Sequence, residues 1–164
     1  MKRFAIALFL SLMSVSLAMA AGSPSIKSSV SNEVKVYNAG VALMMEKKFN
    51  KAEKQFRKSI ALNKRFAEAH NNLAYTLRKQ GPEHYEEALK HYNRAIALKP
   101  GLDEPYMYRG VLYVQMGKKS LALEDHSTLA ARKSPIAEEL QYVIENGREK
   151  EPEQFFGVSQ RIDS

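Results

Sequence analysis

The sequence predicts an all-α fold in which three helical hairpins stack side by side and a capping helix closes the array. The first observation is the spacing of apolar residues along residues 67–102, which recur every three or four positions and therefore share one helical face. The second is the pair Gly81-Pro82, which divides this stretch into two helices. The third is that the whole stretch has a counterpart on each side, at a period of about 34 residues.

The three units span residues 33–66, 67–102 and 103–135. When the units are aligned, a small residue coincides in the first helix of each: Gly40, Ala74 and Gly110. A second small residue coincides in the second helix: Ala52, Ala88 and Ala122. A residue with a ring coincides at a third position: Phe56, Tyr92 and His126. Over residues 33–135 this pattern resembles the tetratricopeptide repeat (TPR) family, most clearly in the central unit. The resemblance implies a right-handed superhelical array whose concave face is lined by the first helix of each unit.

The first 20 residues predict a secretory signal peptide. Two basic residues precede the apolar run 4–17, and residues 18–20 fit a small-x-small cleavage pattern. The run is shorter than the roughly 20 residues that a membrane span needs. We therefore expect an exported chain, periplasmic or secreted, that begins near Ala21 and continues into a flexible leader over residues 21–32. An uncleaved N-terminal anchor is the alternative.

Beyond the third unit, residues 135–147 predict a capping helix. A serine followed by a proline, with acids in the first turn, is typical of a helix start, and a glycine is typical of a helix end. Residues 148–164 form a mostly polar tail that we expect to be mobile. Phe155 and Phe156 are the exception, and we interpret this pair as a contact on the array or as a docking motif.

Composition argues against several classes of function. The chain has no cysteine, which excludes disulfides and thiol catalysis. Loss of the two basic signal-peptide residues lowers the formal net charge from +7 to +5, and a modest positive excess favours acidic partners, although it is equally consistent with a solvated surface. The four histidines and the adjacent carboxylates lack the spacing of a metal or catalytic site. We therefore expect no enzyme activity, no cofactor, no metal and no nucleic-acid partner.

The concave face is the candidate binding surface that the resemblance implies. Its expected lining is apolar at both ends, with asparagines suited to a peptide backbone and a basic pair suited to a carboxylate in the middle. Asn38 is among the inward positions of the first helix. The alternative is that the Met and Val positions are buried by neighbouring helices or by the chain's own tail. The candidate groove residues are Tyr37, Val41, Met44, Asn71, Asn72, Tyr75, Arg78, Lys79, Met107, Tyr108 and Val111.

We therefore expect an exported adaptor or scaffold that binds a protein or peptide segment in its concave groove, with an acidic segment favoured by the net charge. Such a chain would be a monomer or weak dimer without a transmembrane span after signal cleavage. The alternative is a structural subunit packed permanently into a larger cell-envelope assembly. Some TPR domains hold the C-terminal carboxylate of heat-shock chaperones with five polar residues, of which only Asn72 has a counterpart here. We expect Tyr75 and Arg78 to face the groove rather than the core.

Overall fold

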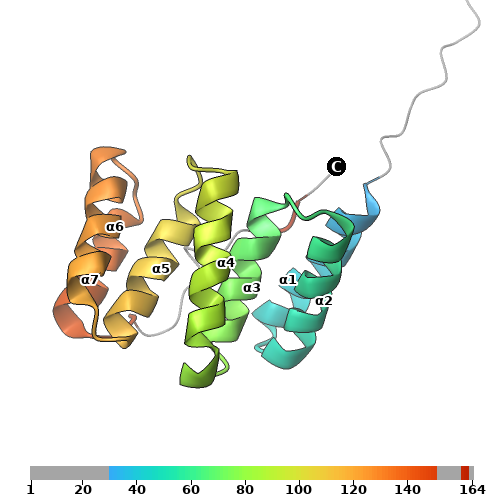
Figure 1. The fold of residues 1–164 in the computed structure, drawn as a ribbon, viewed down its shortest axis with the longest axis horizontal. Helices are drawn as coiled ribbons and strands as arrows, with labels where there is room; N and C mark the ends of the chain where they lie inside the picture. The colour runs from blue at the N-terminus through green and yellow to red at the C-terminus, as the bar shows by residue number, and fades with distance from the viewer. Residues whose placement is uncertain (1–29, 151–159, 163–164) are drawn as a thin grey trace, which may run out of the picture.

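The computed structural model describes residues 30–150 and 160–162, and in these residues it contains helices but no strand (Figure 1). The expected signal peptide and the Phe155-Phe156 pair lie outside the described residues. The predicted all-α fold is confirmed. The helices are α1 (Asn32–Met45), α2 (Phe49–Leu62), α3 (Ala67–Arg78), the 3-10 helix η1 (Pro82–His84), α4 (Tyr85–Leu98), α5 (Glu104–Gln115), α6 (Lys119–Ala131) and α7 (Ala137–Asn146).

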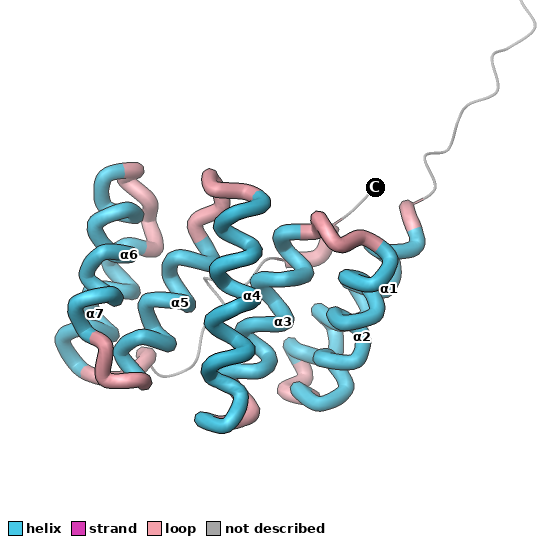
Figure 2. Tube along the Cα trace, viewed as in Figure 1, coloured by secondary structure: helices cyan, strands magenta, loops and turns pink. Residues whose placement is uncertain are grey.

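Consecutive helices pair into three antiparallel hairpins, α1 with α2, α3 with α4 and α5 with α6. Short loops join them at the two ends of the helices (Figure 2). Helix α7 packs against both α5 and α6, as a capping helix should. It begins two residues after the expected start, because residues 135–136 form a turn, and it ends as expected at Gly147, which adopts the left-handed conformation with φ of 72°.

Gly40 and Gly110 show why the repeat has a small residue at this position of its first helix. A Cβ added at Gly40 would lie 2.7 Å from the Phe56 ring, which shows that α1 and α2 approach each other over this atom. At the equivalent position of the third hairpin, a Cβ on Gly110 would lie 2.6 Å from Leu140. At this position, the Phe56 ring of the same hairpin packs against the glycine of the first unit, and Leu140 of the capping helix packs against the glycine of the last unit.

Helix α3 occupies the centre of the array and is buried on nearly all sides. Every residue from 69 to 78 is buried, because α3 contacts α1, α2, α4 and α5. A helix with an ordinary amphipathic pattern therefore behaves as a core helix. This placement brings the polar groove candidates of α3 into an environment where they must find hydrogen-bond partners.

An ion pair joins the two helices of the third hairpin. Arg109 of α5 donates from Nε to Asp125 Oδ2 of α6 at 3.0 Å, and a second nitrogen bonds the other carboxylate oxygen. The same guanidinium donates to Asn93 Oδ1 at 2.7 Å. The Asp125 side chain is only 3% exposed. Burial raises the pKa of Asp125, and the hydrogen bonds and charge of Arg109 oppose this rise. Arg109 therefore limits the rise in the pKa of Asp125 that burial causes.

Candidate functional site

The structure brings the groove candidates from α1, α3 and α5 together on one side of the array. The ring of Tyr75 lies 4.9 Å from that of Tyr108 in an edge-to-face arrangement. The Arg78 guanidinium stacks over both rings, at 5.3 Å and 5.1 Å from their centroids. Tyr37 of α1 accepts a hydrogen bond from Asn72 of α3 at 3.1 Å. The first helices of the three hairpins therefore share one continuous face, in the register that the repeat pattern predicts.

The same residues are buried, which agrees with the alternative given for the Met and Val positions and not with an open groove. Of the eleven candidates only Lys79 is partly exposed. Tyr75 is 0% exposed and Arg78 is 3% exposed, so the expectation that these two avoid the core is wrong. Part of the reason is helix packing, which covers the Met and Val positions. The other part is the chain's own C-terminal residues, which lie on this face. Peptide binding by these residues stays a prediction.

Arg78 holds a carboxylate, as its residue type suggested, and that carboxylate belongs to the same chain. Its two terminal nitrogens donate to the two oxygens of Glu149, at 2.9 Å and 3.0 Å. Lys79 Nζ lies 3.9 Å from the same carboxylate. Burial by itself would lower the pKa of Arg78, but the charge and hydrogen bonds of Glu149, together with Tyr92 and Tyr108, outweigh burial and hold the pKa above its ordinary value. The contact is bidentate, with the Arg78 side chain fully buried and the Glu149 side chain 20% exposed.

A chain of hydrogen bonds crosses the concave face from α3 to the C-terminal residues. The side chain of Asn71 donates to Asn72 at 3.1 Å, and Asn72 donates to the Tyr37 hydroxyl. Tyr37 in turn donates to the backbone carbonyl of Gln160 at 2.8 Å. The two asparagines therefore act together to orient a phenolic donor toward a peptide carbonyl.

Asn38 makes the second backbone contact, and it was absent from the candidate groove set. Its side-chain nitrogen donates to the Ile162 carbonyl at 2.8 Å, and its side-chain oxygen accepts from the Ile162 N–H at 2.9 Å. The Ile162 side chain packs against the core. One amide thus satisfies both backbone groups of a single residue, so the described tail residues at Glu149 and 160–162 are docked rather than free. The sequence could have identified Asn38 as a contact residue, because it combines an inward position with an amide side chain.

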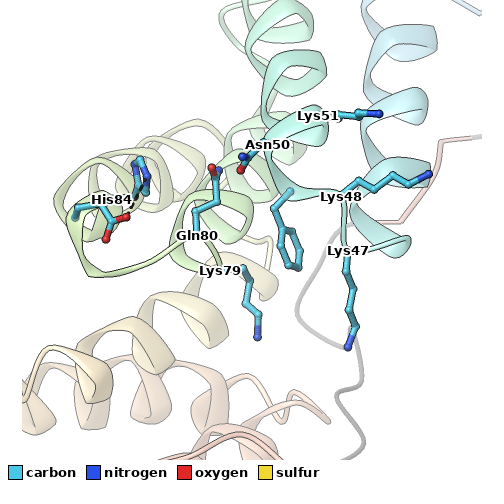
Figure 3. Close-up of a pocket in the computed structure, with 9 residues that line it drawn as sticks. Lys47, Lys48, Asn50, Lys51, Lys79, Gln80 and His84 are labelled. Carbon is cyan, nitrogen blue, oxygen red and sulfur yellow. Dashed lines mark ion pairs between the residues drawn. The ribbon is translucent and has the colours of Figure 1, made fainter.

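A basic hollow lies beside this face, between the α1–α2 turn and the end of α3. It has a volume of about 580 Å³, and Lys47, Lys48, Lys51 and Lys79 all contribute to its lining. In Figure 3 the side chains of Lys47 and Lys79 extend in the same direction. Among the described residues of the lining, Glu83 is the one acidic residue, so the four lysines leave the hollow with an excess of positive charge, which favours an acidic segment.

A histidine pair links α3 to α4 elsewhere on the array. His70 Nδ1 and His91 Nδ1 lie 2.8 Å apart, and their rings stack at 5.1 Å. Such a bond needs one nitrogen with its proton and one without. Burial lowers the pKa of His70, and burial together with His70 lowers the pKa of His91 to about 4. The sequence did not reveal this pair, because its members are 21 residues apart on different helices.

These lowered pKa values predict a stability that depends on pH. Well above pH 6.5 both histidines are neutral in the folded and in the unfolded chain, and their contribution to the free energy of unfolding does not depend on pH. As the pH falls from 6.5 toward 4, the unfolded chain takes up protons that the folded pair excludes, so stability falls. We expect His91 to account for roughly 1–3 kcal/mol over this range.

Urea unfolding at pH 7.5 and pH 5 measures this loss, and His91→Gln should reduce the difference between the two pH values. His126→Gln, on α6, is the matched control and should keep the wild-type difference. A wild-type free energy of unfolding that is the same at both pH values would contradict the prediction.

Neither a metal-binding cluster nor a membrane-spanning helix occurs in the part of the chain that the structure describes. Within residues 30–150 and 160–162, no three His, Asp or Glu side chains gather in a way that could hold a metal ion. Among the described helices, none is both long enough and apolar enough to span a bilayer.

Comparisons with known proteins agree with the architecture. One family model, described as a TPR repeat, matches residues 83–117, and another, described as a tetratricopeptide repeat, matches residues 56–90. A solved CopN-Scc3 complex contains a similar chain with 23% identity and a TM-score of 0.59, covering 75% of this chain and 72% of that one. PcrH in complex with the chaperone binding region of PopD is similar at 19% identity and a TM-score of 0.59, covering 68% and 84%. No curated protein sequence matches the chain.

Proposed function

Because this chain belongs to the tetratricopeptide repeat family, we propose that it is an adaptor that binds an extended, acidic protein segment on its concave face. The observation that carries this proposal is the pairing of two recognition devices on that face. Arg78 holds a carboxylate through both terminal nitrogens, and Asn38 satisfies both backbone groups of one residue. Together they suit a segment with an acidic side chain and an accessible backbone.

Two other observations support a binding role. The basic hollow beside Arg78 would attract an acidic partner and raise its rate of association. The similar solved chains come from protein complexes, one of them with the chaperone binding region of PopD. The fold and these neighbours point to binding rather than catalysis.

A cross-linking experiment tests the proposal. The chain has no cysteine, so a single introduced cysteine carries a photoreactive benzophenone without background labelling. We expect the label at Lys79→Cys to give an adduct with a protein from the host's envelope fraction. We expect the cross-linked peptide to be acidic and the yield to fall as salt is added.

The matched control places the same label at Arg94→Cys, an exposed cation on α4, and should give no such adduct. An adduct formed equally well at both positions, or only at position 94, would show that the concave face is not the binding surface. Recovery of the chain only in a permanent complex would favour the structural-subunit alternative over a monomeric adaptor.

We also propose that the chain acts outside the cytoplasm, on the strength of the apolar run and cleavage pattern in residues 1–20. N-terminal sequencing of the protein made in its host should find a chain that starts at Ala21. A soluble product that retains Met1 would overturn this proposal.

A further inference from the structure

We infer that the C-terminal residues of this chain act as a built-in competitor for the concave face, and that a partner binds by displacing them. This inference rests on the proposed function, because it concerns the same surface. The displaced residues are Glu149 and the segment 160–162, which Figure 1 shows in red beside the first hairpin.

The first argument is the chemistry of the contacts. The tail presents a carboxylate to Arg78, one backbone carbonyl to Tyr37, and one backbone N–H and carbonyl to Asn38. Three of these four groups belong to the peptide backbone and are present in any protein segment. The fourth is a carboxylate, which any acidic residue supplies. The tail therefore occupies the face with the same groups that a foreign acidic segment would use.

The second argument is the contrast in burial across these contacts. On the array side, Tyr37 and Asn72 are 0% exposed and Arg78 is 3% exposed. On the tail side, Gln160 and Arg161 are exposed, and Ile162 is only partly buried. With the tail in place, the donors of the array are therefore desolvated, whereas residues 160–162 of the tail keep part of their surface in water. An occupant with this asymmetry is one that a better-fitting segment replaces.

The third argument is the way the tail is attached. Glu149 lies three residues after the last residue of α7, so the tail is held at a high local concentration beside the face. A foreign segment must compete with this intramolecular contact. If the tail covers the face in about nine molecules out of ten, the apparent affinity for a partner is about tenfold weaker than the intrinsic one.

The chemistry of the displacing partner follows from the same contacts. It is an extended protein segment with one carboxylate for Arg78, with a second acidic group within reach of the lysines that line the basic hollow. A free backbone N–H and carbonyl must reach Asn38. A helical segment has both backbone groups engaged in its own hydrogen bonds and does not satisfy Asn38.

The experiment uses the full chain and a defined probe, a fluorescent synthetic peptide with the sequence of residues 148–164. Its affinity is measured by fluorescence anisotropy for the wild type and for two variants of the tail. Glu149→Lys places a cation against Arg78 and Lys79. Ile162→Asp removes the apolar side chain that packs on the core. We expect the probe to bind either variant about tenfold more tightly than the wild type.

Two controls fix the location of binding. Glu145→Lys makes the same change of charge at an exposed position on α7 and should leave the affinity at the wild-type value. The double variant Glu149→Lys/Asn38→Ala should bind the probe more weakly than Glu149→Lys, because the array then lacks its backbone contact. Far-UV circular dichroism and thermal melts confirm that each variant is folded.

Equal affinity of the probe for the wild type and both tail variants would overturn the inference, and so would failure of the probe to bind any of them. Failure of this inference and failure of the proposed function give different results. If Lys79→Cys cross-links a partner equally well in the wild-type and Glu149→Lys backgrounds, binding on the concave face stands and the competition fails. If the probe binds the tail variants tightly but no partner is cross-linked, the tail does dock as inferred and the adaptor function fails.

Discussion

Replacing Arg109 by methionine is expected to lower the free energy of unfolding by about 3–5 kcal/mol. The physical reason is that the substitution leaves the buried carboxyl group of Asp125 without its partner. Asp125 is 2% exposed, and without the guanidinium the effect of burial on its pKa is no longer opposed. The carboxyl must then stay charged without a counterion or take up a proton on folding, and both cost stability. Urea unfolding at pH 7 measures the difference.

The matched control is Arg57→Met on α2. Arg57 also pairs with carboxylates, Glu53 and Glu87, but its side chain is 43% exposed, and such pairs contribute at most about 1 kcal/mol. The double variant Arg109→Met/Asp125→Leu should recover most of the lost stability, because both charges are then absent. Equal losses for Arg109→Met and Arg57→Met would show that the α5–α6 pair behaves as a surface contact.

Truncating Leu140 to alanine is expected to cost about 2–5 kcal/mol. Leu140 is 0% exposed, and its methyl groups occupy the space over Gly110 where no Cβ is present. Its removal leaves a cavity at the contact that joins the capping helix to the last hairpin. Because each unit of the array contacts mainly its neighbours, the damage should be local at first. Hydrogen exchange should therefore quicken in α5, α6 and α7 before it changes in α1 and α2.

Leu123→Ala is the control for this variant, since Leu123 lies on α6 and is 43% exposed. It should change the stability by less than about 1 kcal/mol. If Leu140→Ala melts at the same temperature as Leu123→Ala, then α7 does not support the array in the way described above.

The architecture was predictable because its determinants are local. Apolar spacing specifies each helix, the glycine-proline pair specifies a turn, and Gly40 and Gly110 mark positions where another helix packs closely. The register was correct to within about two residues, as the start of α7 shows. The choice of Tyr75 and Arg78 as neighbours on one face was also confirmed by the stacking of the guanidinium on the ring.

Burial by the chain's own tail was one of the alternatives, but the residues that make the contacts were not predictable. The contact between Asn38 and Ile162 joins residues 124 apart, and the pair of Arg78 with Glu149 joins residues 71 apart. No periodicity links such positions, and nothing in the sequence distinguishes these tail residues from other polar or apolar residues near a terminus. The histidine pair was missed for the same reason, because each ring was weighed on its own helix. Periodicity determines which way a side chain points, but the occupant of the surface decides whether that side chain meets water.

The glycine at position 110 also limits how the array is lengthened or shortened by design. It leaves an opening shaped for a leucine of the capping helix, and a Cβ there would lie 2.6 Å from Leu140. The central unit carries Ala74 at the same position, fully buried among its neighbours. A longer version of this protein is therefore built by inserting further copies of residues 67–102, with the Gly110 unit kept at the end. In a duplicated last unit, the glycine of each added hairpin would face a copy of α5 in place of Leu140 of the capping helix.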